Sequence, residues 1–275
     1  MARDRDITRE REDIVIDNAH SRAISIIERD AIDLQRFVTP DNTKDIARDM
    51  EYVRRKQEYF ALEPDDGSRK YATVLEAIIL DGISNSGWFG QSTKARKTSL
   101  YDDFHGGIDL VLTFKEDPLS SHTGLAIDVT FANAAIVSGK INEVIEKIRK
   151  GELAKIKYFE TENYRGTLEN IPRVVIGVDR KHLVSLARMW IDPAERKNLA
   201  VHPAQRVLLR EGMCQLEYFA SVARKAGRDE FVHIFEQNAD ILRRIARHKG
   251  TQGINTEDYD EDGVLVTIKR VSGSK

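Results

Sequence analysis

The chain is poor in the features that mark disulfide-stabilised, cysteine-rich zinc and membrane-spanning proteins. Its 275 residues include one cysteine, Cys214, which excludes an internal disulfide and any zinc site built from several cysteines. The longest apolar runs, such as residues 75–80, are far shorter than the roughly 20 residues that cross a bilayer. Residues 1–6 carry mixed charges and no apolar stretch, unlike a secretory signal. We therefore expect a cytoplasmic protein without a membrane partner.

The chain also lacks an excess of charge of one sign. Lys and Arg total 43, Asp and Glu total 45, and the formal net charge is −2. Domains that bind nucleic acid are often strongly basic, so any such binding has to come from a local basic patch. The 41% of hydrophobic residues is too high for a disordered chain, and the length suits one large domain or two small ones.

Hydrophobic periodicity divides the chain into helical ends and a mixed middle. The four regions expected are an N-terminal helical region at 1–67, an α/β core at 68–180, a C-terminal helical region at 181–250 and an acidic tail at 251–275. The helices expected in the two helical regions span about 7–37, 43–62, 181–191, 203–226 and 229–249. The N-terminal pair predicts a helical hairpin that could act as a lid or join two copies of the chain as a homodimer. In the tail, we expect residues 257–262 to be solvated and 264–268 to form a strand.

The middle region has strand-like patterns. Two short apolar runs bounded by turn residues, Gly107–Phe114 and Gly124–Phe131, predict strands buried in a sheet. The other elements expected in this region are helices at about 69–80 and 138–153 and strands at 155–159 and 173–178. Helices that alternate with strands in this way predict a compact α/β unit.

Each of the two central strands contains an aspartate, Asp109 or Asp128, within an otherwise apolar run. A buried carboxylate costs several kcal/mol unless it is paired or binds a metal, so two of them on adjacent strands indicate a cation site. Clustered carboxylate oxygens suit Mg²⁺ or Mn²⁺ better than zinc. The alternative is that both aspartates are structural, bonded to backbone N–H groups or to an arginine.

These residues resemble the PD-(D/E)XK nuclease superfamily, the restriction-endonuclease-like proteins. Its αβββαβ core has a Glu on the first helix, an Asp on one strand and a (D/E)-x-K tripeptide on the next. The matching residues here are Glu76, Asp109 and Asp128-Val129-Thr130. The resemblance covers about residues 69–178 and implies an α/β fold with a restriction-endonuclease-like core and helical additions at both ends. It also implies Mg²⁺-dependent hydrolysis of phosphodiester bonds, with DNA as the expected partner.

Thr130 departs from the family pattern because it stands where the family has its catalytic lysine. Lys140, at the start of the next helix, is the best substitute for that lysine, and Lys157 and Lys115 are weaker candidates. If no lysine takes over the role, the chain is a catalytically weakened relative that binds nucleic acid or another partner.

The resemblance assigns roles to individual residues. The catalytic residues expected are Glu76, Asp109, Asp128 and Lys140, of which the three acids would bind the metal. Glu76 lies off the apolar stripe of its helix, and Asp103 is an alternative acid for the same cluster.

Basic and aromatic residues supply candidates for contact with nucleic acid. Phosphate contacts are expected from Lys94, Arg96, Lys97 and Lys157. Trp88 and Phe89 would either stack on a base or close an edge of the core, and His105 would either assist the site or be structural.

Overall fold

The computed structural model describes residues 2–63, 67–114, 123–131, 133–162, 164–250 and 257–274, which form a mixed α/β fold. The α-helices are α1 (Ala2–Asp30), α2 (Thr43–Leu62), α3 (Ser68–Ser86), α4 (Leu100–Gly106), α5 (Ala134–Lys150), α6 (Arg180–Ile191), α7 (Ala204–Lys225), α8 (Asp229–Gly250) and α9 (Gly263–Ser272). The short 3-10 helices are η1 (Leu34–Phe37), η2 (Arg196–Val201) and η3 (Glu257–Tyr259). The strands are β1 (Thr93–Lys97), β2 (Leu110–Phe114), β3 (Thr123–Thr130), β4 (Ala154–Glu160), β5 (Arg165–Ile171) and β6 (Arg173–Gly177).

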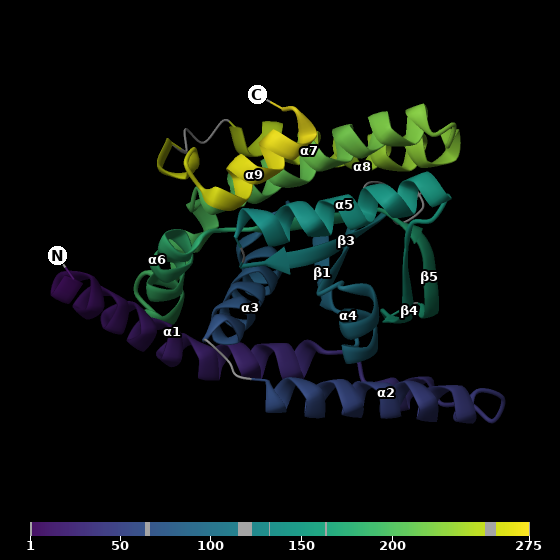
Figure 1. The fold of residues 1–275 in the computed structure, drawn as a ribbon, viewed down its shortest axis with the longest axis horizontal. Coiled ribbons are helices and arrows are strands. Elements are labelled where there is room, and N and C mark those ends of the chain that lie inside the picture. The colour runs from purple at the N-terminus through teal and green to yellow at the C-terminus, as the bar shows by residue number, and fades with distance from the viewer. Residues whose placement is uncertain are drawn as a thin grey trace.

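The central sheet has the strand order β1-β2-β3-β6. The first three strands pair antiparallel, and β6 pairs parallel to β3 after a crossover that contains α5. Within this crossover, β4 and β5 form a separate two-stranded hairpin, which lies beside the sheet in Figure 1. The last strand, β6, is covered by α7, whose Gln215 bonds to both the backbone N and O of Val175.

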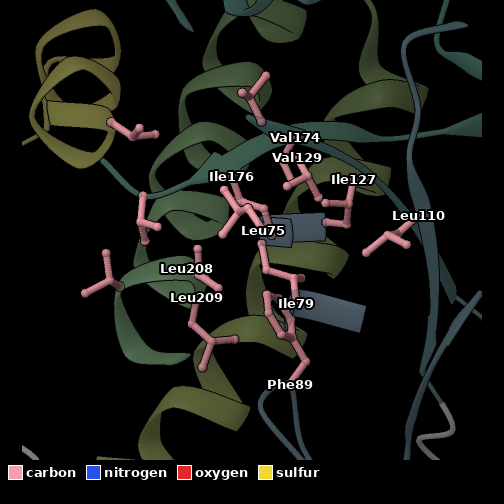
Figure 2. Packing of buried hydrophobic residues seen from close by; sticks show 14 of the residues in the cluster. Leu75, Ile79, Phe89, Leu110, Ile127, Val129, Val174, Ile176, Leu208 and Leu209 are labelled. Carbon is pink, nitrogen blue, oxygen red and sulfur yellow. The ribbon is translucent and has the colours of Figure 1, made fainter. Parts of the chain in front are cut away.

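Alternation along the strands gives the sheet two different apolar faces. Leu110 and Ile127 belong to the main hydrophobic cluster together with residues of α3. Figure 2 shows these side chains near Leu75 and Ile79 of α3. Val111, one position along β2, instead packs in a smaller cluster with residues of β4. The period of two along each strand explains why one face contacts helices and the other contacts the hairpin.

The main hydrophobic cluster is continuous across the regions expected from the sequence. It includes buried residues of α1, α3, the sheet, and helices α5 to α9. In Figure 1, α7, α8 and α9 form a layer beyond α5, while α1 and α2 lie at the opposite end of α3. Ile14 and Leu62 are exposed on the N-terminal helices, and the homodimer through this region stays a prediction. Within the described ranges, no helix has both the length and the apolar character needed to cross a bilayer.

The structure corrects several expected elements. The strand predicted at 264–268 is wrong, because these residues lie in helix α9, which Asp262 caps by accepting hydrogen bonds from Val264 N and Leu265 N. The prediction that residues 257–262 are solvated is also wrong for Tyr259 and Asp262, which are buried. The first helix ends at Asp30 instead of continuing to residue 37. Strands β1 and β5 and helix α4 were not expected from the sequence.

Candidate functional site

A buried lysine lies at the centre of a group of carboxylates. Lys97, the last residue of β1, is 1% exposed. Its Nζ lies 2.8 Å from Glu76 Oε1 on α3, 2.8 Å from Asp103 Oδ2 on α4 and 4.0 Å from Asp109 Oδ1. A buried ammonium needs such partners, because an unpaired buried charge costs several kcal/mol. We call these four residues the lysine cluster.

Local chain geometry brings the lysine cluster together. In the antiparallel pair of β1 and β2, Lys97 lies opposite Leu110, so it is next to Asp109, the residue before β2. Helix α4 connects the two strands, with Ser99 Oγ accepting a hydrogen bond from Asp102 N at 3.1 Å to cap its first turn. Gly107 ends the helix with a φ of 62°, a left-handed conformation that favours glycine. This short helix brings Asp103 back over Lys97.

Burial controls protonation within the lysine cluster. It raises the pKa of Asp109 well above its ordinary value, and the negative charges of Asp103 and Glu76 raise it further. Burial also raises the pKa of Glu76, although the Lys97 ammonium opposes this. For Lys97 itself, burial lowers the pKa, but the nearby carboxylates raise it by more. The lysine therefore stays charged, while Glu76 and Asp109 bind protons more tightly than exposed carboxyl groups do.

The acids of the lysine cluster keep oxygen atoms that are incompletely bonded. Asp109 Oδ2 accepts a hydrogen bond from Val129 N at 2.6 Å, whereas its Oδ1 has the 4.0 Å contact to Lys97. Glu76 Oε1 lies at ion-pair distance from Lys97 but has no hydrogen bond of good geometry. The side chains of Asp103 and Asp109 are 25% and 17% exposed, so solvent reaches the cluster through them.

Asp128 lies close to the lysine cluster but has its own partners. Its Oδ1 lies 2.5 Å from Lys140 Nζ, and its Oδ2 accepts a hydrogen bond from the buried Arg173. Asp109 N donates to Ile127 O at 2.9 Å and Asp109 Oδ2 accepts from Val129 N, so the two aspartates lie near each other. Thr130, two residues further along β3, is buried and uncharged. Lys140 therefore lies beside an expected metal ligand, as the sequence suggested, with its ammonium bound to that acid.

The structure brings Glu76 and Asp109 together and adds Asp103, which the sequence offered as an alternative. Among the described residues, however, neither Glu76, Asp109 and Asp128 nor the three acids of the lysine cluster form a compact set of ligand atoms. Asp179, His182 and Asp262 do form one, with ligand atoms within 4.8 Å of one another. Sequence reasoning missed this second group.

Hydrogen bonds within the protein already account for this second group. Asp262 Oδ2 accepts from Asp179 N at 2.8 Å and lies 2.8 Å from His182 Nδ1. Asp179 caps α6 by accepting from His182 N, and the His182 ring stacks on Tyr259. Because each carboxylate has backbone donors, we interpret the group as a tie between the starts of α6 and α9.

The tie predicts that stability depends on pH. Burial lowers the pKa of His182, but hydrogen bonds to Asp179 and Asp262 outweigh this and raise it to about 9. The stabilisation is therefore complete below the ordinary pKa of about 6.5 and is lost as the pH rises through about 9. We expect a loss on the order of 2 kcal/mol over that range, measured by urea unfolding.

His182→Gln should remove most of this pH dependence. His233→Gln, which alters an exposed histidine of α8, is the matched control and should leave it unchanged. A parent whose stability is constant between pH 6.5 and 9.5 would contradict the charged tie.

The four residues expected to contact phosphates lie in different environments. Lys94 and Arg96 lie on the face of β1 opposite Lys97, where they line a pocket beside the hairpin. Lys97 is buried in the lysine cluster, so it does not belong to an exposed basic patch. Lys157 binds Asp49 and lies over the rings of Tyr101 and Tyr158. Of the four residues expected to contact phosphates, Lys94 and Arg96 therefore remain as a basic patch.

The remaining candidates have structural positions. Trp88 and Phe89 are fully buried in the main cluster, so they close the core and are not free to stack on a base. The ring of His105 stacks on that of Tyr101 at 5.2 Å. Lys115 falls outside the described residues.

Comparisons with known proteins give no further assignment. No family model, no curated protein and no solved structure matches this chain. The chemistry of the lysine cluster therefore has to be inferred from its own residues.

Proposed function

We propose that this protein is a Mg²⁺- or Mn²⁺-dependent nuclease of the PD-(D/E)XK type that hydrolyses phosphodiester bonds in DNA. The observation that carries the proposal is the lysine cluster: a permanently charged lysine held against three carboxylates at the point where β2 begins. A cation next to partly exposed acids provides both parts of a phosphodiesterase site, since acids hold a metal and the lysine stabilises negative charge on the phosphate.

The order of elements supports the same proposal. Leaving out α4 and the inserted hairpin, the chain runs α3, β1, β2, β3, α5, β6, which is the αβββαβ order of the restriction-endonuclease-like core. Glu76 lies on the first helix, Asp109 precedes the second strand and Asp128 lies on the third. These are the positions at which the superfamily has its acids.

The donor atoms of the lysine cluster are of the chemical type that a hard divalent cation prefers. Glu76, Asp103 and Asp109 offer carboxylate oxygens, which Mg²⁺ and Mn²⁺ prefer. Asp128 could join them only by giving up an interaction with Lys140 or Arg173. A bound divalent cation would activate a water molecule and polarise the phosphate. Lys97 would hold a second positive charge in the place of the lysine absent at Thr130.

Thermal unfolding with and without metal tests the proposed site. Because a ligand that binds the folded state stabilises it, millimolar Mn²⁺ should raise the Tm of the parent by a few degrees. Asp109→Asn should abolish the rise, while it keeps a side-chain oxygen that can accept from Val129 N. Asp240→Asn, an exposed acid of α8, is the control and should retain the rise.

Cleavage of plasmid DNA in Mg²⁺ or Mn²⁺, absent in EDTA, tests the activity itself. Metal-independent Tm values together with intact DNA would contradict the proposal.

A catalytically weakened relative of these nucleases is the second candidate function, because the side chains of Lys140 and Arg173 each bind one oxygen of Asp128. A parent that binds DNA in Ca²⁺ but cleaves none in Mg²⁺ or Mn²⁺ would favour this alternative. In that case Thr130→Lys, which restores the family tripeptide, should introduce cleavage.

A further inference from the structure

The pocket lined by Lys94 and Arg96 lies between the central sheet and the hairpin. It has a volume of about 310 Å³. Its floor is a row across three paired strands, Lys94 of β1, Thr113 of β2 and Gly124 of β3. The wall includes Phe159 of β4 and Tyr164, the residue before β5. We call this hollow the hairpin pocket.

Gly124 leaves the hairpin pocket open at its floor. Glycine inside a strand weakens the strand and often marks a close approach of a ligand or of another backbone. The backbone of Gly124 is not left-handed, and a Cβ there would meet Ile171 at an ordinary contact distance of 3.5 Å. Neither conformation nor crowding therefore requires glycine at this position. A larger side chain would fill the pocket.

The walls and rim of the hairpin pocket differ in chemistry. The hairpin contributes Phe159, Leu168 and Ile171, while Lys94 and Arg96 supply two cations from β1. Lys94 has a 3.6 Å contact with Glu162, but both side chains are at least half exposed, and such pairs contribute little. Among the described residues, Arg96 has no carboxylate within ion-pair distance. An apolar slot beside two cations is complementary to a flat ring that carries a phosphate.

We propose that the hairpin pocket binds one unpaired base of the nucleic-acid substrate, with its phosphate on Lys94 and Arg96. This inference rests on the proposed function, since it identifies the substrate as a nucleic acid with a single-stranded segment. Stacking of a base on an aromatic ring tolerates any sequence, and phosphate contacts position the strand without reading it. Gly124 and Asp128 lie on the same face of β3, about 13 Å apart at the usual rise per residue. Ala126, which lies between them on that face, is buried against β4, so a strand bound in the hairpin pocket does not run along β3 to the acids.

Binding of fluorescent oligonucleotides in Ca²⁺, which avoids dependence on cleavage, tests the pocket. The parent should bind a single-stranded 12-mer more tightly than a blunt duplex of equal length. Gly124→Val fills the pocket without changing charge and should weaken binding of the single strand by at least about tenfold, since stacking of one base is worth that much. Tyr164→Ala should act in the same direction. Gly139→Ala in α5, where nothing lies within 4 Å of an added Cβ, is the control for the glycine change.

Charge variants separate phosphate contact from base contact. Lys94→Ala with Arg96→Ala should weaken binding and flatten its salt dependence, whereas Gly124→Val should leave the salt slope unchanged. Folding of each variant is checked by its Tm. Equal affinity of parent and Gly124→Val for the single strand would overturn the proposal, as would preferential binding of blunt duplex.

The two proposals fail in different ways. If the parent cleaves DNA and Gly124→Val binds single strands as tightly as the parent does, the nuclease proposal stands and the pocket proposal fails. If the parent never cleaves DNA but binds single strands more tightly than Gly124→Val does, the pocket proposal stands and the nuclease proposal fails.

Discussion

Replacing Lys97 by methionine is expected to lower the free energy of unfolding by about 3 to 5 kcal/mol at pH 7. Methionine matches the length of the aliphatic stem but removes the charge that Glu76 and Asp103 contact at 2.8 Å. The carboxylates would then repel one another in a buried site. Urea unfolding followed by circular dichroism measures the loss. Lys140→Met is the matched control and should cost about 1 kcal/mol or less, because Lys140 is 31% exposed and Asp128 keeps Arg173.

A second substitution shows whether charge is the cause. In the Lys97→Met background, Glu76→Gln removes one of the repelling carboxylates and should recover part of the lost stability. Lowering the pH should act likewise, because Glu76 and Asp109, whose pKa values are raised by burial, take up protons early as the pH falls. The Lys97→Met variant could instead be equally destabilised at all pH values and not rescued by Glu76→Gln. That result would mean that the loss of packing, and not the loss of charge, causes the destabilisation.

Two aspartates and their strands could be predicted because their pattern is local. Asp109 and Asp128 interrupt runs of β-branched and aliphatic residues, and such runs occur where a strand is buried on both faces. Pairing of β2 with β3 then brings the two acids near each other, since one precedes β2 and the other lies near the end of β3. The pattern needs no knowledge of the rest of the chain.

The role of Lys97 could not be predicted because its partners are distant in sequence. Thr93–Lys97 contains three cations in five residues, and such a composition usually indicates a solvated segment. Lys97 is buried only because three carboxylates on α3, on α4 and before β2 surround it. Alternation within the strand puts Lys97 on the face opposite Lys94 and Arg96, a difference that is visible only once the strand is recognised.

Helix α9 shows the opposite error. A local signal for the start of a helix was present in the sequence, but the strand-like pattern that follows it was given more weight. Val264, Val266 and Ile268 alternate with other residues and favour a strand by propensity. Asp262, directly before them, is a favoured helix N-cap residue, and its carboxylate does accept hydrogen bonds from the first turn. Reading the acidic residues as a solvated tail hid that capping signal.

Cleavage by lysine variants is expected to identify the residue that replaces the missing motif lysine. The structure offers two ammonium groups near the acids, Lys97 beside Glu76 and Asp109, and Lys140 beside Asp128. A preorganised charge stabilises a transition state better than a mobile one, because it does not have to reorganise during the reaction. Lys97 is buried and held by carboxylates, whereas Lys140 is partly exposed and screened by solvent.

We therefore expect Lys97→Met to lose plasmid cleavage by roughly 100-fold or more, since removing one group that stabilises transition-state charge costs roughly 3 to 4 kcal/mol. Lys140→Met should lose less than about tenfold. The assay is run in Mn²⁺ at a temperature where circular dichroism shows that Lys97→Met is folded. The double variant Lys97→Met/Glu76→Gln is not used in the cleavage assay, because Glu76 is itself an expected metal ligand. Loss of cleavage in Lys140→Met with activity retained in Lys97→Met would move the catalytic role to Lys140 and leave Lys97 as a structural counter-ion of the three acids.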